Sequence, residues 1–120
     1  MTRLLLDSDV FVDHLRGRRR ISPGTDDIHF SSVTRAELFA GRSTEEPRVR
    51  RLLEPFIELA VDRAVAERAG RLRRSVTIRL PDALIAATAL EHRLVLVTRN
   101  TKDFATVRGL RLRPVADPPG

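Results

Sequence analysis

Short apolar runs alternate along the chain with longer segments of mixed polarity. Each run is only a few residues long and is bounded by polar residues, which is typical of strands buried on both faces in the middle of a parallel sheet. The first run, at residues 4–6, leads directly into two acids, Asp7 and Asp9. The pattern predicts five strands, at residues 4–6, 28–31, 57–61, 94–97 and 110–112.

Helix signals fill the segments between the predicted strands. Asp9 is placed as the N-cap of a first helix that ends at Gly17, and Asp62 as the cap of a long helix. Strands that alternate with helices imply an α/β fold, with a parallel sheet, right-handed crossovers and helices on both faces. The predicted helices cover residues 10–16, 33–40, a segment that begins at 44–47, 63–75 and 82–92.

Length and apolar content indicate one domain. With 120 residues, 42% of them apolar, the chain can form one ordinary core. We see no repeat or linker and expect a single domain over residues 1–120 with a loose tail at 116–120. No apolar run approaches the ~18 residues of a membrane span, and we see no signal peptide, so we expect a cytoplasmic protein without membrane association.

The charge balance indicates a polyanionic partner. The chain has 22 Lys and Arg against 16 Asp and Glu, a net charge of +6, with basic stretches at residues 16–20 and 63–79. Such an excess suits nucleic acid, because neutralised phosphates release counterions, although charge runs are usually solvated surfaces. The chain has no cysteine and only three scattered histidines, so any metal would have oxygen ligands.

Acidic side chains follow the predicted strands at the edge where ligand sites of parallel sheets lie. Carboxylates gathered in one cleft repel one another unless a cation or hydrogen-bond donors neutralise them. Oxygen ligands favour Mg²⁺ or Mn²⁺, which can activate water for hydrolysis of a phosphodiester. An acidic metal site in a basic protein therefore predicts a nuclease. The candidate ligands are Asp7, Glu37, Asp82 and Asp103, with Asn100 in the same loop as Asp103.

Four segments resemble the motifs of PIN-domain ribonucleases, particularly the VapC toxins of bacterial toxin–antitoxin pairs. They are LLLDSDVFVDHL, SSVTRAELFAG, LPDALIAATAL and LVTRNTKDF, in this order, and they span residues 4–104. The resemblance implies a PIN-like domain with a five-stranded sheet, RNA cleavage with Mg²⁺ or Mn²⁺, a homodimer, and inhibition by a VapB-like antitoxin. By motif, the catalytic and metal-binding acids are Asp7, Glu37, Asp82 and either Asp103 or Asn100, and Ser8 matches the hydroxyl residue after the first acid.

Each acid also has a local structural explanation. In this alternative, Glu37 completes a capping box that begins at Thr34, Asp82 complements a helix dipole, and Asp103 begins a turn. Asp9 is interpreted as a helix cap and not as a metal ligand. The other acids interpreted as surface or cap residues are Asp13, Asp26, Asp27 and Asp62.

Two other functions compete with the nuclease. The sequence from Asp7 to Val10 resembles the nucleophile motif of haloacid-dehalogenase-type phosphatases. That fold also needs a late lysine followed by an acidic pair, and Lys102, the single lysine, has no such pair after it. The second rival is a catalytically silent module that binds nucleic acid or a protein partner.

In the nuclease interpretation, the acids hold one or two divalent ions, and water attacks the scissile phosphate to leave a 5′-phosphate. Phe11, Val12, Leu38 and Phe39 flank the acids on two helices, and we expect them to be partly exposed and to form a groove for the antitoxin. The arginines expected to hold the RNA backbone are Arg18, Arg19, Arg20, Arg71 and Arg74.

Overall fold

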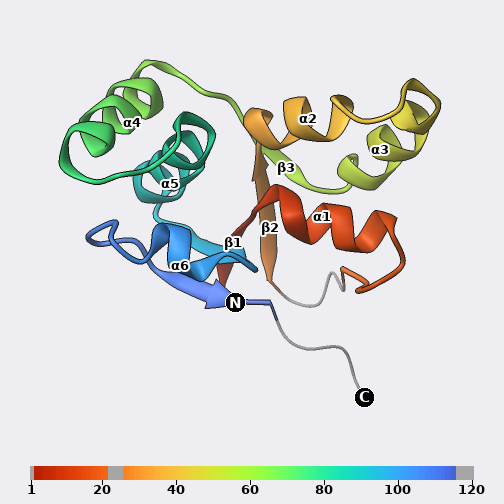
Figure 1. The fold of residues 1–120 in the computed structure, drawn as a ribbon. Coiled ribbons are helices and arrows are strands. Elements are labelled where there is room, and N and C mark those ends of the chain that lie inside the picture. Colours follow the sequence, from red (N-terminus) through yellow and green to blue (C-terminus); the bar gives the residue numbers. More distant parts are fainter. Residues whose placement is uncertain (1, 22–25, 116–120) are drawn as a thin grey trace.

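The computed structural model describes residues 2–21 and 26–115, so the predicted tail at 116–120 lies outside the described residues. Its centre is a sheet of five parallel strands in the order β3-β2-β1-β4-β5 (Figure 1). β1 is the middle strand, and this confirms the predicted parallel α/β fold. The strands are β1 (Arg3–Leu6), β2 (Asp27–Ser31), β3 (Ile57–Leu59), β4 (Val95–Thr98) and β5 (Leu112–Pro114).

Helices connect the strands in the predicted order, and a short helix after β4, at Thr101–Phe104, was not predicted. The Val65 N–H donates to Asp62 Oδ1 at 2.9 Å, which confirms Asp62 as a cap. Gly17 follows the first helix with a φ of 71°, a conformation that suits glycine. None of the described helices is both long and apolar enough to cross a lipid bilayer. The helices are α1 (Ser8–Leu15), α2 (Ser32–Phe39), the 3-10 helix η1 (Ser43–Glu45), α3 (Glu46–Leu53), α4 (Arg63–Ser75), α5 (Leu80–His92) and α6 (Thr101–Phe104).

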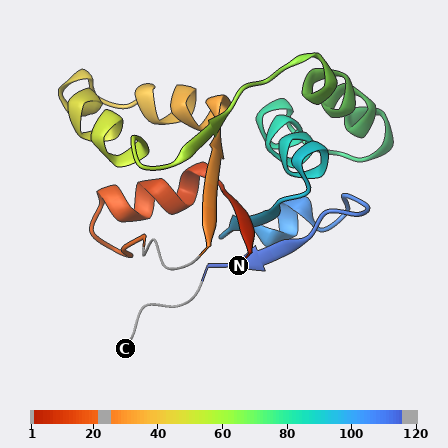
Figure 2. The same cartoon turned by 180° about the vertical axis from the view of Figure 1, so that it is seen from behind.

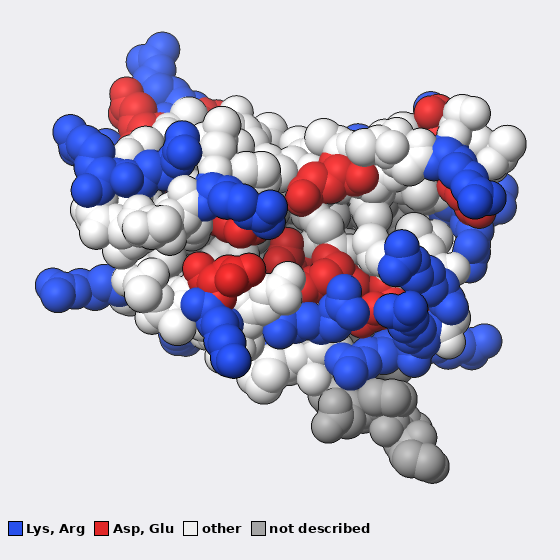
Figure 3. Space-filling model, in the orientation of Figure 1, with Lys and Arg blue, Asp and Glu red and all other residues white. Residues whose placement is uncertain are grey.

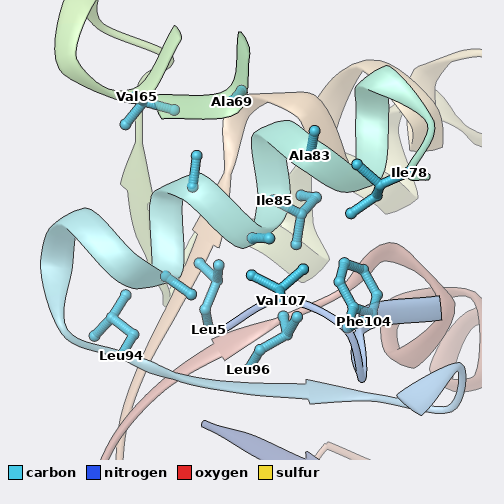
Figure 4. Packing of buried hydrophobic residues seen from close by; sticks show 13 residues of the cluster. Leu5, Val65, Ala69, Ile78, Ala83, Ile85, Leu94, Leu96, Phe104 and Val107 are labelled. Carbon is cyan, nitrogen blue, oxygen red and sulfur yellow. The ribbon is translucent and has the colours of Figure 1, made fainter. Parts of the chain in front are cut away.

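Helices cover both faces of the sheet. Alternate residues of each strand point to opposite faces, so both faces present apolar side chains that must be buried. On one face, Leu5 and Leu96 pack with residues of α4, α5 and α6, including Phe104 (Figure 4). On the other face, Leu4 and Leu6 pack with residues of α1, α2 and α3. Figure 2 shows the two helix groups from behind, with β3 and the segment after it passing from the α3 side towards α4. The sheet therefore lies between two hydrophobic cores, one on each face, and these cores fix the positions of the strand ends.

The start of α1 differs from the sequence prediction. The helix begins at Ser8 rather than Val10, because Asp7 and not Asp9 is its N-cap. The Asp7 backbone is extended, and its carboxylate accepts the Ser8 N–H at 2.8 Å. Asp9 therefore lies in the first turn of α1, where its side chain can reach the sheet edge.

All five strands differ from their predicted bounds, by one residue at one or both ends in β1, β2 and β4 and by two in β3 and β5. β3 ends at Leu59, two residues earlier than predicted. β5 begins at Leu112 rather than at residue 110. A turn at Gly109, with a φ of 81°, precedes β5 and delays its pairing with β4.

The carboxyl ends of β1 and β4 lie side by side. The backbone N–H of Asp7 donates to the Val97 carbonyl at 3.0 Å, which continues the β1–β4 pairing one residue past β1. Asp7 is thereby brought beside Thr98, the last residue of β4, although the two residues are far apart in the sequence. This edge of the sheet is where the sequence predicts the active site.

Candidate active site

Acidic side chains gather at the carboxyl edge of the sheet. Figure 3 shows them near the centre of one face, partly in a hollow, with basic side chains around them. The elements that converge there are the ends of β1 and β4 and parts of α1, α2, α5 and α6. They supply Asp7, Asp9, Glu37, Asp82 and Asp103.

Asp7 is held rigidly. Its side chain is only 7% exposed. One carboxylate oxygen accepts the Ser8 N–H at 2.8 Å, and the other lies 2.9 Å from the Thr98 hydroxyl, which donates to it. The sequence prediction placed Asp7 at this edge but did not identify Thr98 as its partner.

Asp9 belongs to the same cluster, so its interpretation as a helix cap is wrong. Its Oδ2 accepts hydrogen bonds from the Thr98 hydroxyl at 3.2 Å, the Arg99 N–H at 3.1 Å and the Asn100 side-chain amide at 3.3 Å. Its Oδ1 is buried and has no hydrogen-bond partner among the described residues. The two residues after β4 therefore donate to Asp9, and the single hydroxyl proton of Thr98, at the end of β4, is shared between Asp7 and Asp9.

The surroundings of the buried Asp7 and the partly buried Asp9 disfavour two ionised carboxylates. Burial, then the nearby charge of Asp9 and to a smaller extent that of Asp82, raise the pKa of Asp7 from 3.8 to about 6, although the Ser8 and Thr98 hydrogen bonds oppose this. Burial also raises the pKa of Asp9. A cation bound beside these groups would relieve the repulsion.

Ser8 connects Asp7 to Glu37. The Ser8 hydroxyl donates to Glu37 Oε1 at 2.6 Å, and it also lies 3.3 Å from the hydroxyl of the buried Thr34. The capping-box explanation of Glu37 is wrong, because α2 begins earlier, at Ser32, and its cap is the Ser31 hydroxyl, which accepts the N–H of residue 33 at 3.0 Å. Glu37 is therefore oriented by a side chain of α1.

Asp82 and Asp103 form a second acidic group. Both line a cavity of about 560 Å³ between the end of α4, the start of α5 and α6. Asp82 lies in the first turn of α5, with Arg79 Nη2 3.5 Å from its Oδ2, and Asp103 is exposed on α6. Asn100 instead faces Asp9, so the two candidates for the fourth position of the motif contact different acids.

The acids are not arranged as a ready metal site. Within residues 2–21 and 26–115, no three Asp, Glu or His side chains are close enough together to bind one ion. The donor set nevertheless fits a divalent cation in kind and charge, because all ligands are carboxylate oxygens and Asp7 is buried with uncompensated charge. Glu37 and Asp103 are exposed, and Glu37 is linked to the residue after Asp7 through the Ser8 hydroxyl.

Asp13 was interpreted as a surface or cap residue, and this is wrong, because it is only 2% exposed. Its Oδ1 lies 3.2 Å from Arg99 Nη1, at an angle that does not make a hydrogen bond. Arg99 Nε also lies 3.9 Å from Asp9 Oδ2. Arg99 thus carries the positive charge that two acids of α1 share.

Only two of the four apolar residues predicted to form a groove beside the acids are partly exposed. Phe11 and Leu38 are buried and belong to the core, whereas Val12 and Phe39 are partly exposed, as expected. A cavity of about 380 Å³ lies between α1, α2 and α3, and Glu37 is on its wall. Its apolar lining is Val12, Leu15, Leu38 and Val49.

The predicted RNA-binding arginines do not line the cavity that holds Asp82 and Asp103. Arg18 and Arg20 are exposed beside the end of α1, and Arg71 and Arg74 are exposed on α4. The cations that line the cavity with Asp82 and Asp103 are different residues. They are Arg73, Arg79 and Lys102, which are not among the five arginines predicted to hold RNA.

Comparison with known proteins agrees with this architecture. Residues 4–110 match the PIN domain. Ribonuclease VapC10 of Mycobacterium tuberculosis is 40% identical over 124 residues, which cover 90% of each chain. The tRNA(fMet)-specific endonuclease VapC of Shigella flexneri is 28% identical over 127 residues, which cover 92% of this chain and 96% of the relative.

A solved structure shows the same fold. One chain of a toxin–antitoxin complex from Klebsiella pneumoniae superposes with a TM-score of 0.76 at 35% identity, and the match covers 94% of this chain and 96% of that one. These matches leave no support for the haloacid-dehalogenase alternative. The chain belongs to the PIN-domain family and, within it, to the VapC ribonucleases.

Proposed function

We propose that this chain is the toxin of a toxin–antitoxin pair and hydrolyses RNA phosphodiester bonds with Mg²⁺ or Mn²⁺. One observation carries the proposal: the buried Asp7 and the partly buried Asp9 lie side by side at the sheet edge of a basic protein, and the pKa of Asp7 is raised to about 6. Such a pair is costly in an empty protein and is compensated when a cation binds. The names of the relatives, both RNA-cleaving enzymes, support RNA as the substrate.

Four acids would hold the metal: Asp7, Glu37, Asp82 and Asp103. When bound, the ion activates water and stabilises the leaving oxygen of the scissile phosphate. The chain itself orients these ligands, because the Ser8 hydroxyl holds Glu37 at 2.6 Å and fixes its direction.

The β1–β4 edge supplies the rigid part of the site. Thr98 donates to Asp7, and Asn100 donates to Asp9, so neither acid can turn away. Water attacks the phosphorus, the bond to the 3′-oxygen breaks, and a proton passes to that oxygen. The products carry a 5′-phosphate and a 3′-hydroxyl. Basic side chains around the acids hold the RNA backbone, with Arg18, Arg19, Arg20, Arg71 and Arg74 as the sequence-based candidates.

The antitoxin would bind in the cavity between α1, α2 and α3. The Klebsiella relative is part of a toxin–antitoxin complex, which supports a VapB-like partner. The cavity has a mostly apolar lining, and Glu37 lies on its wall. A partner segment bound in the cavity would therefore also cover Glu37. With RNA as substrate and an antitoxin as partner, the proposal includes a cytoplasmic location.

A homodimer is part of the proposal. Three large apolar side chains are exposed in the described part of the chain, which is unfavourable for a monomer in water. They are Ile57 at 54%, Val61 at 38% and Leu80 at 48% exposure. Burial of these side chains against a second copy would remove the cost.

A manganese titration tests the metal site without relying on activity. Mn²⁺ should raise the melting temperature of the wild type, because a ligand that binds only the folded state stabilises it by mass action. Asp82→Asn should show little of this rise, whereas Asp62→Asn, which removes an exposed acid at the cap of α4, should respond like the wild type. An equal rise in all three proteins would contradict the proposed ligands.

A further inference from the structure

We propose that the cavity between α4, α5 and α6 binds a phosphate of the RNA strand next to the bond that is cut, and that Arg73, Arg79 and Lys102 hold this phosphate. The cavity, of about 560 Å³, has Asp82 and Asp103 on its wall. The inference rests on the proposed function, because it assigns a second contact of the same substrate. It goes beyond the sequence-based expectation, which named Arg71 and Arg74 of this helix and neither Arg79 nor Lys102.

The three cations are available to a ligand. Arg73 Nε donates to the Ile78 carbonyl at 3.2 Å, which fixes the guanidinium and leaves its terminal nitrogens unpaired within the described residues. Lys102, the only lysine, lines the cavity and forms no ion pair with any described residue. Two of the three cations can therefore accept a phosphate without breaking an ion pair.

Arg79 contacts an acid of the active site in the absence of RNA. Its Nη2 lies 3.5 Å from Asp82 Oδ2, and its side chain is 81% exposed. An ion pair this exposed contributes little to stability. Arg79 can therefore exchange Asp82 for a phosphate of the RNA at little cost, and this exchange does not require a bound metal ion.

The charges of the cavity wall fit an anion next to the metal ligands. Three cations face two carboxylates, so the cavity wall carries a net positive charge even without a metal ion. Arginine guanidinium groups match phosphate oxygens in pairs, and the hydroxyls of Thr77 and Thr106 add donors to the same wall. No aromatic residue is among the described lining, so the site offers no surface for base stacking. We infer a contact to the RNA backbone that does not depend on base sequence.

The other candidate arginines of α4 are in a different position. Arg71 and Arg74 are exposed on the same helix but do not line this cavity. Arg68 is already paired with Glu91 at 2.6 Å. Among the arginines of α4, Arg73 is therefore the one placed to contact a phosphate near the acids.

Salt-dependent RNA binding tests the proposal. The probe is a short fluorescein-labelled single-stranded RNA of mixed sequence, in EDTA so that it stays uncut, and the readout is fluorescence anisotropy at increasing KCl. The variant Arg73→Gln/Arg79→Gln removes two charges from the cavity. The matched control, Arg51→Gln/Arg63→Gln, removes two exposed charges from α3 and from the far end of α4.

The expected effect follows from counterion release. Each lost phosphate contact should flatten the slope of log K against log salt by about 0.7 and weaken binding about five-fold near 0.1 M salt. The cavity variant should therefore bind up to about 25-fold more weakly, the control should stay within about two-fold, and Arg73→Lys/Arg79→Lys should recover the slope because it keeps both charges. Lys102→Gln, at an exposed side chain, repeats the test for one contact if the double variant does not fold.

Two results would overturn the inference. One is an unchanged slope in the cavity variants, or an equal change in the control. The other is normal RNA binding with lost antitoxin binding, which would show that an acidic antitoxin segment occupies the cavity. Binding in EDTA requires neither metal nor cleavage, so a wild type that fails to cut RNA would refute the proposed function and would not affect this test.

Discussion

Replacing Asp7 by Asn should make the folded protein more stable at neutral pH. The substitution keeps the shape of the side chain, and Asn is as good a helix N-cap as Asp. The amide oxygen can still accept the Ser8 N–H. The amide nitrogen can donate to Thr98 Oγ1, whose own hydrogen then goes to Asp9 Oδ2 at 3.2 Å. The hydrogen bonds can thus be kept while one buried charge is removed.

The pKa of Asp7 sets the size of the effect. Its rise from 3.8 to about 6 means that the ionised side chain costs the folded state about 3 kcal/mol at pH 7. Loss of the favourable charge at the start of α1 offsets about 0.3–1 kcal/mol. The net gain of about 2 kcal/mol corresponds to a rise in melting temperature of about 5–10 °C.

The pH dependence has a definite sign. A group whose pKa is raised in the folded state contributes its full stability below its unfolded value of 3.8 and loses it as the pH rises through about 6. The advantage of Asp7→Asn over wild type should therefore be small at pH 4 and should grow to its full size by pH 7.

Thermal unfolding followed by circular dichroism, in metal-free buffer across this pH range, measures the effect. Asp62→Asn is the matched control, because Asp62 is also a helix N-cap but is exposed and lies outside the acidic cluster. It should leave stability unchanged or slightly lower at every pH. A lower melting temperature for Asp7→Asn at neutral pH would refute the reasoning, since it would mean that Asp7 is a structural cap whose charge the fold already compensates.

Three further predictions concern the surroundings of the site. Ser8→Ala removes the hydroxyl that holds Glu37 at 2.6 Å, so it should weaken Mn²⁺ binding about 10–100-fold without unfolding the protein. A wild-type Mn²⁺ affinity of this variant, measured by isothermal titration calorimetry, would contradict this. Arg99→Gln leaves the buried Asp13 without its cation at 3.2 Å and should cost about 1–3 kcal/mol in urea unfolding. The added substitution Asp13→Asn should restore most of that stability, and a double variant no more stable than the single one would argue against the pair. Val12→Asp places a charge in the apolar cavity next to α2 and should weaken antitoxin binding at least about ten-fold, whereas unchanged affinity in a pull-down titration would move the antitoxin to another surface.

The sequence was sufficient to predict the fold and the location of the site. Each strand in the middle of a parallel sheet is a short apolar run, so Leu4–Leu6 was visible as β1 without other information. The position of Asp7 at the sheet edge followed from topology alone, because parallel strands bring their carboxyl ends together.

The partners of the acids depended on contacts between distant segments. Where α1 begins is decided by the pairing of Asp7 with Val97 of β4, and this pairing makes Asp7 rather than Asp9 the cap. Thr98 carried no signal of its own, because a threonine at the end of a strand is common. Asp13 is buried because it meets Arg99 from the other end of the chain.

The basic stretch shows another limit of the sequence. Residues 63–79 contain many arginines, and the sequence could not distinguish those that face the acids from those that face solvent. The end of α4 and its connection to α5 turn Arg73 and Arg79 towards Asp82. The three-residue spacing between Arg79 and Asp82 was a usable signal, since side chains three apart are neighbours at the start of a helix.

Analysis of RNA cleavage ends tests the central claim most directly. RNA should be incubated with the metal-stripped wild type or Asp82→Asn, each with added Mg²⁺ or Mn²⁺ or with EDTA, and the new ends identified by sequencing that requires a 5′-phosphate. We expect new 5′-phosphate ends from the wild type with either metal, none in EDTA, and none from Asp82→Asn under any condition. Full cleavage by metal-stripped Asp82→Asn in EDTA, or ends with a 2′,3′-cyclic phosphate, would contradict a carboxylate-held metal as the catalyst.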